Sequence, residues 1–231
     1  MKRIEHWLFD LDDTLYPASN GMFGHISQRI TQRVSDTLGL SLDEARTVQK
    51  AYWKKYGTSL RGLVVEHGVD PEAYLTYVHD VPIEQLLSRD EALRALLQRL
   101  PGRRHIFTNS PREYALRVLA ALGVDDLFEQ VFDIRHCDLR PKPDPHAYTR
   151  VLAALDAPAR ACLFVDDAPR NLHPARAHGM TTVWLRSPHS QAGGQAGLSV
   201  ASADEAPADV IIDALTELEE ALTRHFNGHD S

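Results

Sequence analysis

Two aspartates near the start of the chain, Asp10 and Asp12, have the types and spacing for acid–base or metal chemistry. They follow a short apolar run over residues 6–9, which is typical of a buried parallel strand, and ligands bind outside the carboxyl ends of such strands. Carboxylates this close repel one another unless a cation intervenes. Mg²⁺ suits that position because it usually takes one or two carboxylates together with phosphate oxygens and waters. Taken alone, the stretch is better explained as an acidic turn in which Asp13 or Thr14 caps a helix.

Three further polar stretches favour a binding site over an acidic turn, because each follows a predicted strand or the loop beside one. Thr108 and Asn109 follow one strand, and Lys142 lies between two prolines that stiffen its loop. Asp166 and Asp167 end another strand. On one parallel sheet all of them would meet at the same edge as the first pair of acids. Their chemistry is complementary, since carboxylates bind a cation while a hydroxyl, an amide and an ammonium hold phosphate oxygens.

The elements that must position these side chains form two groups. From about residue 21 to residue 81 the pattern is helical throughout, with apolar residues at helical spacing over 22–38 and a capping box of Ser41 and Glu44 opening a second helix. The rest of the chain alternates strands and helices, which predicts a parallel sheet covered on both faces. The predicted strands lie at residues 6–9, 105–107, 131–134, 161–165, 181–185 and 210–212.

In order and in separation, the four polar stretches resemble the four motifs of the haloacid dehalogenase superfamily of phosphotransferases. The resemblance implies an α/β fold with a Rossmann-like parallel sheet, helices on both faces and a small all-helical cap inserted after the first strand. It divides the chain into a core over residues 1–16 and 88–231 and a helical cap over residues 17–87. Residues 9–17 and 140–145 are most similar to the pyrimidine 5′-nucleotidase branch.

The resemblance also implies a role for each residue. Asp10 is the nucleophile, which attacks phosphorus and forms an aspartyl-phosphate, so that one hard displacement becomes two easier ones. Asp12 is the general acid and base, which protonates the leaving alcohol and then activates the hydrolytic water. Thr108, the backbone amide of Asn109 and Lys142 stabilise the oxygens of the transferring phosphoryl group, and positioned charge of this kind is usually the largest catalytic contribution.

Mg²⁺ is the cofactor that the resemblance implies. Its ligands are the Asp10 side chain, the backbone carbonyl of Asp12 and one acid of the later pair, where Asp167 is favoured as the direct ligand and Asp166 acts through a water. The implied activity is hydrolysis of a phosphomonoester of a small metabolite, with a pyrimidine nucleoside 5′-monophosphate favoured. Asp12 argues against a dehalogenase, because a halide leaving group needs no proton. The alternatives are a sugar-phosphate phosphatase or phosphomutase on the same scaffold and, less favoured, a non-catalytic binding protein.

Two helix ends and one loop are predicted from local patterns. Ser88 with Glu91 is expected to form a capping box. Ser110 is preferred as the cap of the helix that follows it rather than as a site residue. Residues 187–208 are rich in Ser, Gly, Ala and Pro without periodicity, which indicates a loop.

Several side chains near the motifs have open interpretations. Tyr52, Trp53 and Tyr56 are assigned to the core of the helical cap rather than to substrate stacking. Arg170 and Asn171 either orient the Asp pair that precedes them or have plain surface roles.

The composition argues against several classes of protein. The 231 residues are 43% hydrophobic and 25% charged, which is ordinary for a soluble globular chain, and the length suits one α/β domain with an insertion or two small domains. The formal charge of −7 argues against a nucleic-acid polymer or an anionic membrane as partner, and no apolar run approaches the ~20 residues of a membrane span. With no export signal and only Cys137 and Cys162, a cytoplasmic protein with reduced thiols is expected, as a monomer or homodimer.

Overall fold

The computed structural model describes residues 4–186 and 208–227, so the predicted loop over residues 187–208 lies outside the described residues except for Ala208. Within this part, six strands form one sheet in the order β3-β2-β1-β4-β5-β6, and every neighbouring pair is parallel. The predicted α/β fold with a Rossmann-like parallel sheet is therefore confirmed. The strands are β1 (His6–Phe9), β2 (Arg103–Phe107), β3 (Gln130–Phe132), β4 (Cys162–Asp166), β5 (Thr181–Leu185) and β6 (Val210–Ile212).

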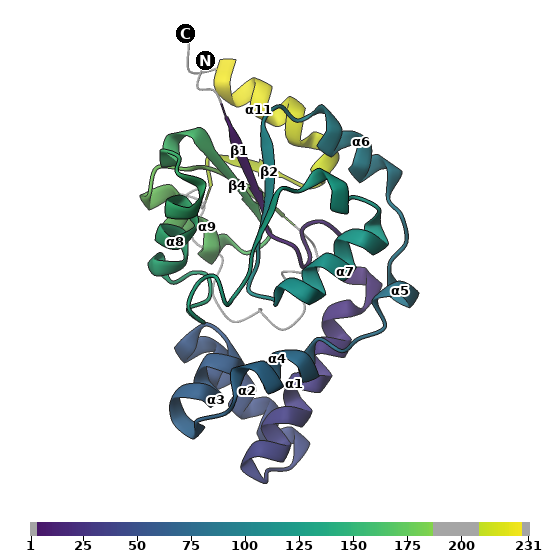
Figure 1. Ribbon diagram of the computed structural model, residues 1–231, viewed down its shortest axis with the longest axis vertical. Helices are drawn as coiled ribbons and strands as arrows, with labels where there is room; N and C mark the ends of the chain where they lie inside the picture. The colour runs from purple at the N-terminus through teal and green to yellow at the C-terminus, as the bar shows by residue number, and fades with distance from the viewer. Residues whose placement is uncertain (1–3, 187–207, 228–231) are drawn as a thin grey trace.

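Helices cover both faces of this sheet (Figure 1). Side chains alternate along a strand, so Trp7 and Phe9 of the central strand β1 pack into one core cluster and Leu8 packs into the other. Burial on both sides explains why β1 is an uninterrupted apolar run. The first cluster includes α6 (Glu91–Arg99), α7 (Arg112–Leu122) and α11 (Leu218–Asn227), and the second includes α8 (Pro145–Leu155) and α9 (Pro169–Ala177).

Four helices between β1 and β2 pack against one another below the carboxyl ends of the strands in Figure 1. Their shared core contains Val34, Tyr52, Leu63 and Leu75, one from each helix and all buried. This unit therefore has apolar packing of its own next to the edge of the sheet where the polar stretches end. The four helices are α1 (Met22–Leu38), α2 (Leu42–Tyr56), α3 (Ser59–His67) and α4 (Pro71–Val78).

The helix ends follow capping chemistry, with one correction. At the start of α2, the Ser41 hydroxyl accepts a hydrogen bond from the Glu44 amide and the Glu44 carboxylate accepts one from the Ser41 amide, so this capping box is confirmed. The box predicted at Ser88 is wrong. The carboxylate of Asp90 caps α6 instead, accepting a hydrogen bond of 2.8 Å from the Leu93 amide, because it stands directly before the first helical residue.

Some short elements are not predicted by the sequence patterns. The strand predicted over residues 131–134 ends at Phe132, since the next side chain, Asp133, accepts hydrogen bonds from the amides of Arg112 and His136 and so turns the chain. The short helices are α5 (Ile83–Leu86), η1 (Ala18–Asn20), η2 (Asp125–Leu127), η3 (Ala159–Ala161) and η4 (Leu215–Glu217).

In the described part of the chain, no helix has both the length and the apolar character needed to cross a bilayer.

Candidate active site

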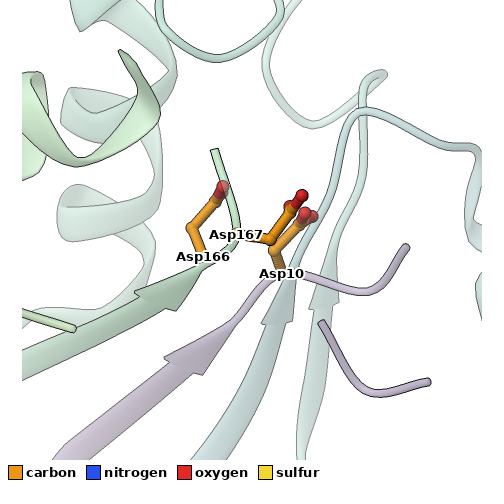
Figure 2. Close-up of side chains that lie close together, drawn as sticks. All are labelled: Asp10, Asp166 and Asp167. Atoms are coloured by element: carbon orange, nitrogen blue, oxygen red, sulfur yellow. The ribbon is translucent and has the colours of Figure 1, made fainter. Parts of the chain in front are cut away.

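Three carboxylates meet at the carboxyl edge of the sheet. Strands β1 and β4 are parallel neighbours in which Phe9 pairs with Val165, so Asp10 lies next to Asp166 and Asp167. One oxygen from each of these acids lies within 4.8 Å of the others, and Figure 2 shows the Asp10 and Asp167 carboxylates side by side. Strand order alone thus brings together polar stretches that are far apart in the sequence.

Lys142 reaches this cluster from the loop before α8. Its ammonium donates hydrogen bonds to Asp10 Oδ1 at 2.8 Å, Asp166 Oδ2 at 2.8 Å and the Phe107 carbonyl at 2.7 Å. The side chain is only 1% exposed. Burial alone would lower the pKa of Lys142, but the two carboxylates outweigh it and the pKa is raised. The lysine is therefore a fixed positive charge inside the site rather than a solvated surface group.

Asn109 holds the lysine loop in place. Its side-chain oxygen accepts a hydrogen bond of 2.8 Å from the Lys142 amide, and its side-chain nitrogen donates one of 3.1 Å to the Lys142 carbonyl. Neighbouring Thr108 is buried, with its hydroxyl accepting a hydrogen bond of 3.0 Å from the Ser110 amide. Both residues line a cavity that Asp10 and Asp167 also line. The amide side chain of Asn109 thus has a positioning contact that the sequence does not indicate.

The two acids after β4 have different surroundings. Asn171 donates hydrogen bonds of 3.0 Å to both oxygens of Asp166, and the Ala168 amide adds one of 2.8 Å. Of the two alternatives for Asn171, it therefore orients this acid and does not have a plain surface role. Within residues 4–186 and 208–227, no group donates a hydrogen bond to the Asp167 carboxylate, although this residue is only 6% exposed. Asp167 is therefore the acid with its oxygens available to a ligand.

The electrostatics of the cluster fit a divalent cation. Burial raises the pKa of Asp10, with Lys142 opposing the rise and Asp166 adding to it. Burial, Asp166 and Asp10 together raise the pKa of Asp167 well above its usual range. Three carboxylates lie beside a single ammonium, and every potential metal ligand among them is a hard oxygen atom of the kind that Mg²⁺ prefers. The residues present are thus suited to hold Mg²⁺.

Asp12 is held by three hydroxyl groups. Ser110 donates a hydrogen bond of 2.8 Å to Oδ2, and Tyr114 donates one of 2.8 Å to Oδ1, which also accepts one from Tyr16. Burial and the charge of Asp12 raise the pKa of both phenols well above the usual range, so they stay protonated and donate. The prediction that Ser110 caps α7 is wrong: the amide of Arg112, the first helical residue, donates to Asp133 instead, and the Ser110 hydroxyl faces Asp12.

Sequence reasoning misses Tyr16 and Tyr114 as members of the site. Each lies four residues after another member, Asp12 and Ser110 respectively. Neither interval lies within a helix, since residues 12–16 form a turn and α7 begins only at Arg112, so the sequence carries no local signal for these contacts.

This cavity, of about 670 Å³, is lined both by Asp10, Asp12 and Asp167 and by residues of α1–α4. Its volume suits a small-molecule ligand. Trp53 lines this cavity, and the guanidinium of Arg170 lies 3.9 Å from the centre of the Trp53 ring. The assignment of Trp53 to the core of the helical cap is therefore wrong. Tyr52 and Tyr56 do pack in that core, as predicted. Arg170 thus contacts the helical unit from the start of α9, which neither alternative for it foresees.

The fold and the site define an α/β protein with an acidic pocket at the carboxyl edge of a parallel sheet. The chain belongs to the haloacid dehalogenase-like hydrolase family, whose model matches residues 4–179.

Three individual proteins show how the similarity extends. The "Phosphate metabolism protein 8" of Saccharomyces cerevisiae is 31% identical over 193 residues, which cover 75% of this chain but only 59% of that protein. A HAD phosphatase from Thermococcus onnurineus has a TM-score of 0.62 at 22% identity, covering 95% of this chain and 98% of the other. A β-phosphoglucomutase from Clostridium difficile has a TM-score of 0.66 at 16% identity, covering 98% of each chain. The two structures share the fold with this chain.

Proposed function

We propose that this chain is a phosphomonoester hydrolase that forms an aspartyl-phosphate on Asp10 and acts on a small phosphorylated metabolite. The contrast between the two aspartates after β1 supports this most directly. Asp10 is paired with the buried ammonium of Lys142 beside Asp167, whereas neutral hydroxyls hold Asp12. Two titratable groups in such different surroundings suit different roles in one reaction.

In the first half-reaction a carboxylate oxygen of Asp10 attacks phosphorus, and the bond from phosphorus to the leaving oxygen breaks. Lys142, Thr108 and the backbone amide of Asn109 stabilise the phosphoryl oxygens as charge develops on them. The buried position of Lys142 strengthens this contribution, because a charge acts more strongly where water is excluded.

Asp12 moves the protons. It gives a proton to the leaving oxygen in the first half-reaction and takes one from water in the second, when that water attacks the aspartyl-phosphate and restores Asp10. The three hydroxyls around its carboxylate fix the direction in which this proton is presented.

We propose Mg²⁺ as the cofactor, held by the side chains of Asp10 and Asp167 and by the backbone carbonyl of Asp12, with Asp166 acting through a water. When bound, Mg²⁺ neutralises the carboxylate and phosphate oxygens that must approach one another. The hydrogen bonds that already engage Asp166 support its indirect role.

Residues 17–87 are proposed as a cap over a core of residues 1–16 and 88–231. Helices α1–α4 within this range line the cavity opposite the acids, where a cap excludes water and contacts the rest of the substrate. The similarity of residues 9–17 and 140–145 to the pyrimidine 5′-nucleotidase branch makes a pyrimidine nucleoside 5′-monophosphate the first substrate to test.

The test is turnover of p-nitrophenyl phosphate and of a nucleotide panel, with Mg²⁺ and with EDTA. We expect Mg²⁺-dependent release of inorganic phosphate, loss of turnover in Asp10→Asn with the fold intact, and a phosphoryl adduct on Asp10 by mass spectrometry of the quenched enzyme. Phosphate transferred to a sugar instead of water would identify a mutase. Absence of turnover on every compound, or activity of Asp10→Asn near that of the wild type, would refute the proposal.

A further inference from the structure

A row of cations lies on the side of α2 that lines the cavity. Arg46, Lys50 and Lys54 follow one another at intervals of four residues, so they lie along one side of the helix, and all three line the cavity. Each is exposed at its surface. These three side chains form the cationic row.

The cationic row has no acidic partners in the described part of the chain. Lys55, which belongs to the same helix but does not line the cavity, pairs with Glu66 at 2.9 Å. Like charges four residues apart on a helix repel one another and destabilise it slightly. Unpaired cations at this spacing therefore weaken α2 on their own, which is the pattern of a site for an anion rather than of a stabilising surface.

The setting of the row makes it distinctive. The chain has a formal charge of −7, and every acid that lines the cavity comes from the core: Asp10, Asp12, Asp13 and Asp167. The cationic row therefore forms a local positive wall that faces the end where the phosphoryl group is proposed to react. Such a wall attracts the anionic part of a ligand even when the whole protein is acidic.

The guanidinium of Arg170 adds positive charge beside the row. It lies 3.9 Å from the ring centre of Trp53, which stands on α2 between Lys50 and Lys54. Its Nε atom is buried and has no hydrogen-bond partner among the described residues. Arg170 itself lines the cavity, so its charge adds to that of the cationic row.

We infer that the cationic row is a subsite for a second anionic group of the substrate, a carboxylate or a second phosphate, away from the phosphoryl group that is transferred. This inference rests on the proposed function, because the first phosphate is placed at Asp10 and Lys142. The preferred substrates are then phosphomonoesters that carry another negative group, and compounds with one phosphate and no other charge are poorer.

The experiment compares two matched pairs of substrates. One pair is 2-phosphoglycolate and 2-hydroxyethyl phosphate, which tests a carboxylate. The other is cytidine 3′,5′-bisphosphate and cytidine 5′-monophosphate, which tests a second phosphate. We expect wild-type kcat/KM to favour the member with the extra anion by about tenfold in at least one pair, which is the size that two or three partly exposed charge contacts supply.

Two variants of α2 separate the subsite from a general loss of positive charge. In Lys50→Gln/Lys54→Gln the preference should fall to about threefold or less, as expected when two of the charge contacts are lost. In the control Lys55→Gln it should stay at the wild-type level, because that lysine does not line the cavity. Equal kcat/KM for both members of each pair in the wild type, or an equal loss of preference in the control, overturns the inference.

Turnover of p-nitrophenyl phosphate separates failure of this inference from failure of the proposed function. If that compound is hydrolysed without any preference in the matched pairs, the function stands and the subsite does not. If no phosphate ester is hydrolysed, titration calorimetry with the same four compounds tests the subsite directly. Tighter binding of the member with the extra anion, lost in Lys50→Gln/Lys54→Gln, supports it, and equal binding overturns it.

Discussion

The phenol of Tyr114 donates a hydrogen bond of 2.8 Å to the carboxylate of Asp12 across 102 residues of sequence. The same phenol lies 2.9 Å from the phenol of Tyr16, which contacts the same carboxylate oxygen. Tyr114 is 2% exposed, so this contact is made away from bulk water. The orientation of the proposed general acid is therefore set jointly by α7, an element that begins after β2, and by Tyr16 from the turn in which Asp12 stands.

We predict that Tyr114→Phe slows turnover without unfolding the protein. Removal of one hydrogen bond loosens the Asp12 carboxylate, and a loss of about tenfold in kcat is expected for a misplaced proton donor. The loss should be larger for alkyl phosphates, whose leaving oxygen needs a proton, than for p-nitrophenyl phosphate, whose leaving oxygen does not. Steady-state kinetics on both kinds of ester measure this difference.

Tyr77→Phe is the matched control for that variant. Tyr77 lies on α4 beside the guanidinium of Arg29, and no hydrogen bond of its hydroxyl is found within the described residues. It should retain wild-type kinetics on both esters. An equal loss on both esters in Tyr114→Phe would point to a general structural defect instead of a role in proton transfer.

The placement of the acids is largely predictable from the sequence, because parallel neighbouring strands end at the same edge. Asp10 and Asp167 needed only the correct strands and the correct class of sheet. The hydroxyls around Asp12 are a different matter. A lone tyrosine in a helix, such as Tyr114, is read as core, and only the docking of α7 beside the first turn reveals its other contact.

The position of Trp53 shows a second limit. Val48, Tyr52 and Tyr56 recur every four residues along α2 and face the core of the helical unit. Trp53 is one residue out of step with that row, so it lies toward the cavity. Strict attention to the period of four would have separated it from Tyr52, whereas its contact with Arg170 depends on the docking of α2 against the core and has no local signal.

Asp167→Asn should remove the effect of Mg²⁺ on thermal stability. Saturation of a site to ten times its Kd stabilises a protein by about 1.4 kcal/mol. For a chain of this length that corresponds to a rise of about 3–5 °C in Tm. We expect this rise for the wild type and none for the variant, whose carboxamide is a poor ligand for Mg²⁺. In EDTA the variant should melt at or above the wild-type temperature, because one of three crowded carboxylates is gone.

Differential scanning calorimetry at fixed pH measures both effects of Asp167→Asn. The exposed Asp36 of α1 provides a control, since Asp36→Asn removes the same charge away from the cavity. Asp36→Asn should keep the full response to Mg²⁺. A wild-type response that persists in Asp167→Asn would place the metal ion elsewhere.

A pair of buried histidines on the neighbouring strands β1 and β2 predicts a pH dependence of stability. His6 Nδ1 lies 3.1 Å from His105 Nε2 and their rings stack, so one nitrogen must donate and the other accept. Burial lowers the pKa of His105 to about 4 from the ordinary 6.5 and lowers that of His6 as well. Between about pH 6.5 and pH 4 the unfolded chain then binds more protons than the folded one. The part of the stability that the histidines contribute is full above that window and decreases as the pH falls through it, by up to about 3 kcal/mol for His105, while the raised pKa of Asp10 acts in the opposite direction.

Urea unfolding at pH 7 and pH 5 measures this dependence. His105→Phe removes the titrating ring while keeping an aromatic side chain against Phe132. On going from pH 7 to pH 5 this variant should therefore lose less stability than the wild type, or gain more. His173→Gln changes an exposed histidine and should keep the wild-type difference. Identical pH dependence in the wild type and His105→Phe would show that the buried pair is not its source.

The packing of α3 on α2 gives a prediction about stability alone. A Cβ added to Gly62 would lie 2.4 Å from Cγ of Tyr52, which is far inside van der Waals contact, and the buried Tyr52 ring has little room to move. Gly62→Ala should therefore destabilise the protein by about 1–3 kcal/mol despite the better helix propensity of alanine. Gly24→Ala, also within a helix but with no atom within 4 Å of the new Cβ, should be neutral or stabilise by up to about 1 kcal/mol. Denaturant midpoints of the two variants decide the matter, and a Gly62→Ala variant as stable as Gly24→Ala would mean that α2 and α3 are not packed this closely.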